Sequence, residues 1–122
     1  MKIKLISILL VFLMVSSLFV SCGEKEQTFE EAARTLQDEI AGFGYLTYEI
    51  TEIDLRKVLI IRYNADKYGD EAVGMSFWFI KTISEEYSTR IAELFGHIDG
   101  CAVVAVAMVN GESFKEETLF VN

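Results

Sequence analysis

The amino-acid sequence predicts an α+β fold, a two-layer α/β sandwich whose elements follow the order αββαββ. Two segments show the 3.6-residue apolar spacing of amphipathic helices, and two segments with strand composition follow each of them. The two middle strand segments are apolar on both faces, as expected of strands in the centre of a sheet. An Asn110-Gly111 pair, the strongest turn signal in the chain, joins the last two strands as a hairpin.

The first helix is expected at about residues 29–41. Thr28 and Glu31 have the spacing of a capping box, in which two side chains satisfy the free backbone donors of a helix start. Gly42 is a natural stop. The first strand is expected at residues 46–51, where apolar and polar side chains alternate, so one face should meet the core and the other water.

The second strand is expected at residues 58–63, and a polar loop over residues 64–70 follows it. Asp70 is of a residue type that caps helices, so a long second helix should begin there and end near Phe95. Seven residues at helical spacing predict its core-facing stripe: Val73, Phe77, Ile80, Ile83, Tyr87, Ile91 and Leu94.

The third strand is expected at residues 101–109 and the fourth at residues 112–121. A crossover helix brings the third strand back parallel to the second, and the two apolar strands should lie in the middle. These constraints favour the sheet order 1-2-3-4. The alternative order, 2-1-3-4, is fully antiparallel and places the apolar second strand at an edge, which is unfavourable.

The two central strands carry more apolar surface than one layer of helices can cover. In the second strand, Val58 and Ile60 point to one face while Leu59 and Ile61 point to the other. A soluble monomer rarely exposes an apolar patch larger than several hundred Å². The second face is therefore expected to be covered by the first helix in a three-layer arrangement, by a second copy, by a partner protein or by an apolar ligand.

The N-terminus has the composition of an export signal. Two lysines precede an apolar run over residues 5–20, which is short for a membrane span of about 20 residues. The stretch Phe19-Val20-Ser21-Cys22 resembles the lipobox of bacterial lipoproteins, with a small residue before the cysteine. The resemblance implies cleavage before Cys22 and acylation of its thiol and its new amino group. An uncleaved apolar anchor, with Cys22 as a bystander, is the alternative.

The resemblance divides the chain into a signal peptide (1–21), an acylated cysteine with a polar tether (22–27) and a single domain (28–122). The lipid anchor would hold the domain at a membrane on the exported side of the cell envelope, periplasmic or extracellular. Loss of the two N-terminal lysines leaves nine basic and nineteen acidic side chains, a net charge of −10. So acidic a domain disfavours a nucleic-acid partner.

Few residues suggest chemistry. His97, the single histidine, lies two residues from Asp99, a spacing that suggests a general base and its orienting carboxylate; a residue at a helix C-terminus is the simpler interpretation. Asp66, Asp70 and Glu71 offer oxygen ligands for calcium, although capping and solvated loop charge also explain them. No cofactor is expected.

Two further features bear on packing and binding. Cys101 opens an apolar strand and is expected to be a small buried side chain. Trp78 and Met75 project away from the predicted stripe of the long helix, and an outward tryptophan is a common interface anchor. Cover by the first helix or by a loop is the ordinary alternative for the tryptophan.

The leading functional hypothesis is a non-catalytic, lipid-anchored envelope domain. It binds a protein partner, or itself, through an apolar sheet or helix surface. The second hypothesis is a carrier of a small apolar ligand, with a pocket between sheet and helices lined by Phe77, Tyr63 and Phe95. The third is a small hydrolase using His97 and Asp99. The sequence contains no nucleophile elbow and no Gly-rich phosphate loop.

Overall fold

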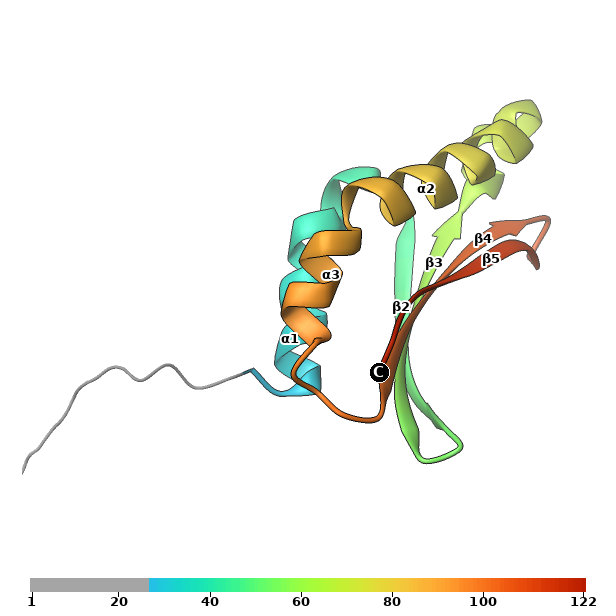
Figure 1. Cartoon of the computed structure of the whole chain (residues 1–122). Coiled ribbons are helices and arrows are strands. Elements are labelled where there is room, and N and C mark those ends of the chain that lie inside the picture. The colour runs from blue at the N-terminus through green and yellow to red at the C-terminus, as the bar shows by residue number, and fades with distance from the viewer. Residues whose placement is uncertain (1–26) are drawn as a thin grey trace, which may run out of the picture.

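The computed structural model describes residues 27–122, which form a four-stranded mixed sheet with three α-helices on one face (Figure 1). The predicted lipobox lies outside the described residues. No helix within residues 27–122 is long and apolar enough to cross a membrane. The elements are α1 (Phe29–Ile40), the 3-10 helix η1 (Ala41–Phe43), β2 (Leu46–Ile53), β3 (Arg56–Asn64), the 3-10 helix η2 (Ala65–Glu71), α2 (Ala72–Glu86), α3 (Ser88–Phe95), β4 (Cys101–Val109) and β5 (Glu112–Val121).

The predicted capping box begins α1. The Thr28 side chain accepts a hydrogen bond from the Glu31 N–H at 3.1 Å, and the Glu31 carboxylate accepts one from the Thr28 N–H at 3.0 Å. Each bond satisfies a backbone donor that the first turn would otherwise leave free. The helix ends in η1, and the chain then turns at Gly44, whose φ of +76° suits glycine.

The sheet has the order β2-β3-β4-β5, which confirms the order 1-2-3-4 and contradicts the 2-1-3-4 alternative. The central strands β3 and β4 run parallel, and each pairs antiparallel with an edge strand. The β4–β5 hairpin turns at Asn110 and Gly111, where φ is +57° and +75°. Positive φ at both residues is the signature of the predicted type I′ turn.

The predicted order αββαββ is not matched in full, because the long second helix is two helices. Tyr87, with φ −111° and ψ 1°, ends α2 and precedes α3. The predicted loop before α2 is the 3-10 helix η2. Asp70 does not cap the helix: α2 begins at Ala72 and has no side-chain cap.

The stripe predicted for the second helix is wrong in its first half. Val73 and Phe77 are 46% and 51% exposed. Ala72 and Ser76, one position earlier along the chain, face the sheet instead and are buried. Small side chains let α2 approach the sheet closely, while Phe77 packs on its flank against Phe114 of β5, with ring centroids 5.7 Å apart.

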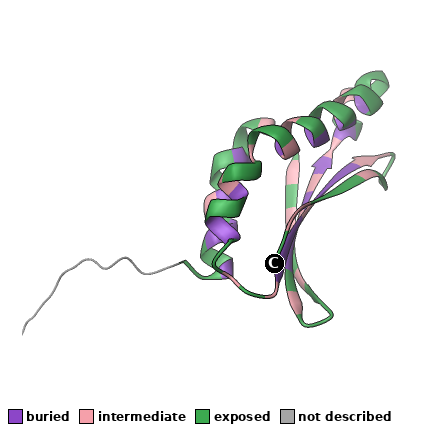
Figure 2. Cartoon of the chain, viewed as in Figure 1, coloured by how far each residue is buried: buried purple, intermediate pink, exposed green. Residues whose placement is uncertain are grey.

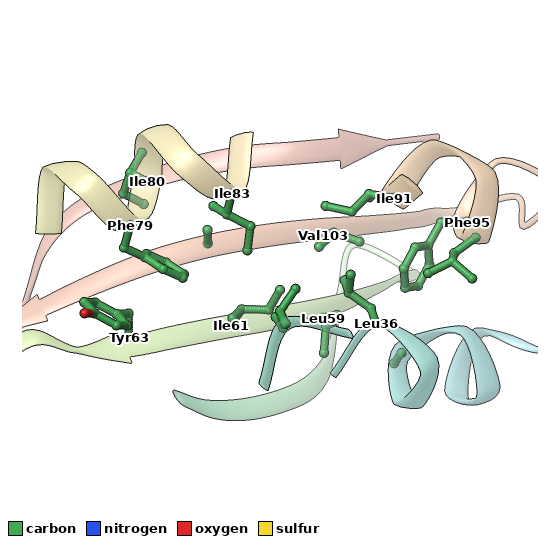
Figure 3. Close-up of a cluster of buried hydrophobic side chains, with 14 of the residues drawn as sticks. Leu36, Leu59, Ile61, Tyr63, Phe79, Ile80, Ile83, Ile91, Phe95 and Val103 are labelled. Atoms are coloured by element: carbon green, nitrogen blue, oxygen red, sulfur yellow. The ribbon is translucent and has the colours of Figure 1, made fainter. Parts of the chain in front are cut away.

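The core lies between the helices and one face of the sheet (Figures 2 and 3). Tyr63 of β3 and Phe79 of α2 stack in parallel with ring centroids 4.6 Å apart. Cys101 is fully buried, as predicted, and its thiol donates to the Ile98 carbonyl at 3.3 Å. Burial raises the pKa of that thiol, so it stays protonated near neutral pH.

All three helices cover the same face. Leu36 of α1 packs in one cluster with Leu59 and Ile61 of β3 and with Ile83 of α2. In Figure 1 the helices lie to the left of and above the sheet, and no described element covers its right side. The three-layer arrangement, with α1 on the second face, therefore does not occur.

Candidate functional site

The face of the sheet opposite the helices forms an apolar groove of about 390 Å³, which we call the open face. Its position follows from strand alternation: Leu59, Ile61 and Tyr63 point into the core, so the residues between them point the other way. All four strands contribute to the lining, which consists of Ile53, Val58, Ile60, Arg62, Val104, Val106, Met108, Ser113 and Glu116.

Aliphatic side chains from the two central strands form the floor of the groove. Val58 and Val106 are each only 5% exposed although no helix covers them, because their neighbours on the twisted sheet shield them. Ile60 and Val104 lie opposite each other in the parallel ladder and are partly exposed. The apolar area that a ligand or partner could remove from water is therefore mainly that of the partly exposed residues such as Ile60 and Val104.

Charged side chains stand at the edges of this floor. Arg62 forms an ion pair with Glu49 of β2, with Nη2 and Oε1 2.8 Å apart. Glu116 of β5 stands on the opposite side, and none of the ion pairs within residues 27–122 involves it. The groove is therefore apolar at the bottom, with one uncompensated carboxylate at its rim.

Trp78, one of the two predicted interface anchors, lies on the helix side of the molecule and is 43% exposed. Its ring contacts Phe43 of η1 edge-on, with centroids 5.2 Å apart. Met75, the other predicted anchor, is partly buried against the core. A second surface pocket of about 210 Å³ lies at Trp78 and is lined by Gly42, Phe43, Trp78, Thr82, Glu86 and Tyr87.

His97 and Asp99 lie in the turn between α3 and β4. The His97 Nε2 is 2.8 Å from the carbonyl oxygen of Gln27, which ties this turn to the chain before α1. Among the described residues no hydrogen bond or ion pair joins His97 to Asp99. The hydrogen bond with Gln27, the one polar contact of the imidazole within residues 27–122, is structural in kind.

The Asp66 carboxylate hydrogen-bonds to the β4–β5 turn. It accepts hydrogen bonds from the backbone N–H groups of Asn110 and Gly111, the latter at 3.1 Å. Within residues 27–122 no three His, Cys, Asp or Glu side chains are grouped as metal ligands. Asp66 and Asp70 line one surface pocket of about 400 Å³, and Glu71 is not among its lining residues.

The ligand pocket expected between sheet and helices is not formed by the three residues predicted to line it. Tyr63 and Phe95 are fully buried core residues, whereas Phe77 lies outside. The Tyr63 hydroxyl is buried without a hydrogen-bond partner in the described part of the chain, and burial raises its pKa. The phenol therefore stays neutral at ordinary pH.

Sequence reasoning found the floor of the open face and expected acidic groups at its rim, but it did not identify Ile53 and Glu116 or the pocket at Trp78. Ile53 and Glu116 could have been found from the hairpin registers, since each pairs across a turn that the sequence marks. Glu86 and Tyr87 could not have been found in this way, because the sequence predicts one unbroken helix through both residues. No protein-family model, curated protein or solved structure matches this chain.

Proposed function

We propose that this chain is a non-catalytic, lipid-anchored domain of the cell envelope that binds a protein partner through the open face. The observation that carries the proposal is the uncovered apolar floor formed by β3 and β4. Central strands that are apolar on both faces need cover on both, and the described part of the chain supplies it on one.

Charge favours a partner over a second copy. The domain after signal cleavage carries a net charge of −10, so two copies repel each other. The free carboxylate of Glu116 adds to this at the rim. The partner that fits is an apolar segment flanked by basic side chains, whose apolar stripe covers the floor while its cations meet the acidic rim.

The anchor limits where that partner lies. If Cys22 carries the lipid, residues 22–27 separate it from α1, and six extended residues span about 20 Å. The domain then stays close to the membrane surface, and its partner must reach within that distance. This part of the proposal rests on the lipobox resemblance.

A carrier of a small apolar ligand is the second candidate. The observation in its favour is the size of the groove, since about 390 Å³ falls within the roughly 300–1,000 Å³ of typical ligand sites. The site would be the open face rather than a pocket beneath the helices.

Site-specific photo-crosslinking of the full chain in its own cells tests the proposal. A benzophenone amino acid at Val104 is expected to give one protein adduct, while the same group at Ala92, exposed on α3, gives none. Ile60→Asp should abolish the adduct and Ala92→Asp should not. Cys22→Ala should release the chain from the membrane fraction and weaken the adduct.

The mass of the adduct separates the alternatives. An adduct of two copies of this chain would show that the open face mediates self-association and not binding to a partner protein. Absence of any adduct at Val104, or equal adducts at Val104 and Ala92, would contradict binding through the open face. A lipid or small molecule crosslinked at Val104 would favour the carrier.

A further inference from the structure

The pocket at Trp78, here called the aromatic pocket, lies on the helix side of the molecule and is separate from the open face. Its volume is about 210 Å³, and its walls come from η1, from the second half of α2 and from Tyr87. Three of its six residues are aromatic: Phe43, Trp78 and Tyr87. The remaining side chains add one hydroxyl, from Thr82, and one carboxylate, from Glu86.

The rings are arranged around Phe43. Its centroid lies 5.2 Å from that of Trp78 and 5.9 Å from that of Tyr87, and the ring planes meet at 66° and 51°. Tilted rings leave parts of their faces free, and the face of an aromatic ring attracts a cation through its quadrupole. The break at Tyr87 is what brings this ring to the end of α2.

Glu86 adds a negative charge at the end of α2. The last turn of α2 has no basic residue. None of the ion pairs within residues 27–122 involves Glu86, so its carboxylate is free to meet a ligand.

The cation–π contacts of the described chain lie elsewhere. The two such contacts within residues 27–122 are those of Lys57 with Phe29 and of Lys115 with Phe77. Neither reaches the aromatic pocket. The aromatic rings and the carboxylate of the pocket therefore favour a positive charge that no ion pair or cation–π contact within residues 27–122 provides.

We propose that the aromatic pocket binds an organic cation, an ammonium group that carries alkyl substituents. Such a group matches the lining, because its alkyl surface packs on the rings while its charge faces Glu86. A hard metal ion fits poorly, since it needs several oxygen ligands and the pocket has one carboxylate. The same chemistry occurs in a free quaternary ammonium ligand and in a lysine side chain of a partner.

Trp78 is the single tryptophan of the chain, so its fluorescence reports on this pocket alone. The full chain in a maltoside detergent is titrated with choline at constant ionic strength, and separately with 3,3-dimethylbutan-1-ol, the neutral isostere of choline. We expect a saturable change in emission with choline and binding at least about tenfold weaker for the neutral isostere.

Three variants test which side chains of the pocket bind the cation. Glu86→Gln is expected to weaken choline binding about tenfold, and Tyr87→Leu by a similar factor. Glu85→Gln is the matched control, because it removes the same charge from the neighbouring exposed residue, which does not line the pocket. Both glutamates are exposed, so neither change should disturb folding.

A third titration, with n-butylammonium, distinguishes the two sources. Tighter binding of choline points to a quaternary ammonium ligand, and tighter binding of n-butylammonium to a lysine side chain; either result supports the cation site. The proposal is overturned if neither cation gives a saturable change, if the neutral isostere binds as well as choline, or if Glu86→Gln and Glu85→Gln have equal effects. The crosslinking test at Val104 is independent of these outcomes.

Discussion

Asp66 illustrates how one carboxylate can have either of two roles that its sequence neighbourhood does not distinguish. Beside Asp70 and Glu71 it has the composition of a calcium loop, yet its oxygens accept the N–H groups of a turn more than forty residues away. The type I′ turn exposes these donors, and an acidic acceptor satisfies both. Long-range partners of this kind follow from the packing of η2 beside the β4–β5 hairpin, which no local pattern encodes.

Asp66→Ala is therefore expected to lower the free energy of unfolding by about 1 kcal/mol, since it removes two charge-assisted hydrogen bonds at an exposed site. Asp70→Ala, in the same 3-10 helix but without such bonds among the described residues, should change it by less than about 0.5 kcal/mol. Urea denaturation measures both values, and amide exchange at Asn110 and Gly111 should accelerate only in the first variant. Equal losses in the two variants would show that Asp66 does not stabilise the turn.

The elements divide into those that local signals define and those that packing defines. The capping box, the Asn-Gly turn and strands apolar on both faces were each predicted correctly, because their signals are local and unambiguous. The set of side chains that α2 turns toward the sheet was predicted wrongly in the first half of the helix. Residues 72–80 are nearly all apolar, so two adjacent stripes both match a 3.6-residue period. Contact with the sheet selected the stripe with the smaller side chains.

Two glycines at the helices provide a test of what packing adds to propensity. Gly74 lies inside α2 with nothing within 4 Å of the position of a Cβ atom, whereas a Cβ on Gly96 would lie 2.5 Å from the Ala92 carbonyl oxygen. Gly74→Ala should stabilise the fold by about 0.5–1 kcal/mol through helix propensity. Gly96→Ala should destabilise it by about 1–2 kcal/mol, because the end of α3 must shift.

Thermal and urea unfolding of these two variants give the comparison directly. Both substitutions add one methyl group. A difference in sign between their effects on the free energy of unfolding therefore reports the steric contact at Gly96. If both variants gained stability, the close approach at the end of α3 would be relieved at no cost. If both lost it, Gly74 would have a role that its open surroundings do not reveal.

At the scale of the molecule, the most useful sequence observation was that the two central strands are apolar on both faces. Two central strands with two apolar faces each need cover on both sides, and the sequence left open whether the first helix, a second copy, a partner or a ligand covers the second side. The open face is that second side, and no helix within residues 27–122 covers it. The aromatic pocket could not be predicted in the same way. It depends on the break at Tyr87 and on the return of η1 to α2, both of which arise only when the elements pack together.

Two ion pairs join α1 to neighbouring elements. Glu30 of α1 meets Lys57 of β3 at 2.9 Å, and Glu39 of α1 meets Arg90 of α3 at 2.7 Å. The second pair is the more specific, since Nε and Nη2 of the guanidinium both donate to the carboxylate. The hydrogen bond from Arg90 holds the pKa of Glu39 below its ordinary value.

The sign of that pKa shift fixes how the fold responds to acid. A carboxyl whose pKa is lower in the folded state stabilises the fold above its unfolded pKa of about 4.5, and this contribution disappears as pH falls through the folded pKa. Near pH 7, Glu39→Gln should therefore cost about 0.5 kcal/mol, a small value because both partners are partly exposed. Once the pH lies below the folded pKa, the carboxyl is protonated and nearly isosteric with glutamine, so the two proteins should become equally stable.

Urea denaturation at a series of pH values measures this convergence, with Glu85→Gln as the control because none of the ion pairs within residues 27–122 involves that residue. The stability of the wild type should fall more steeply than that of Glu39→Gln as the pH drops from the unfolded pKa of about 4.5 through the folded pKa, and the control should follow the wild type. A difference that stayed constant with pH would assign the effect of Glu39 to packing rather than to charge. A difference that grew as pH fell would contradict the ion pair, because no carboxylate contact strengthens as the carboxylate is protonated.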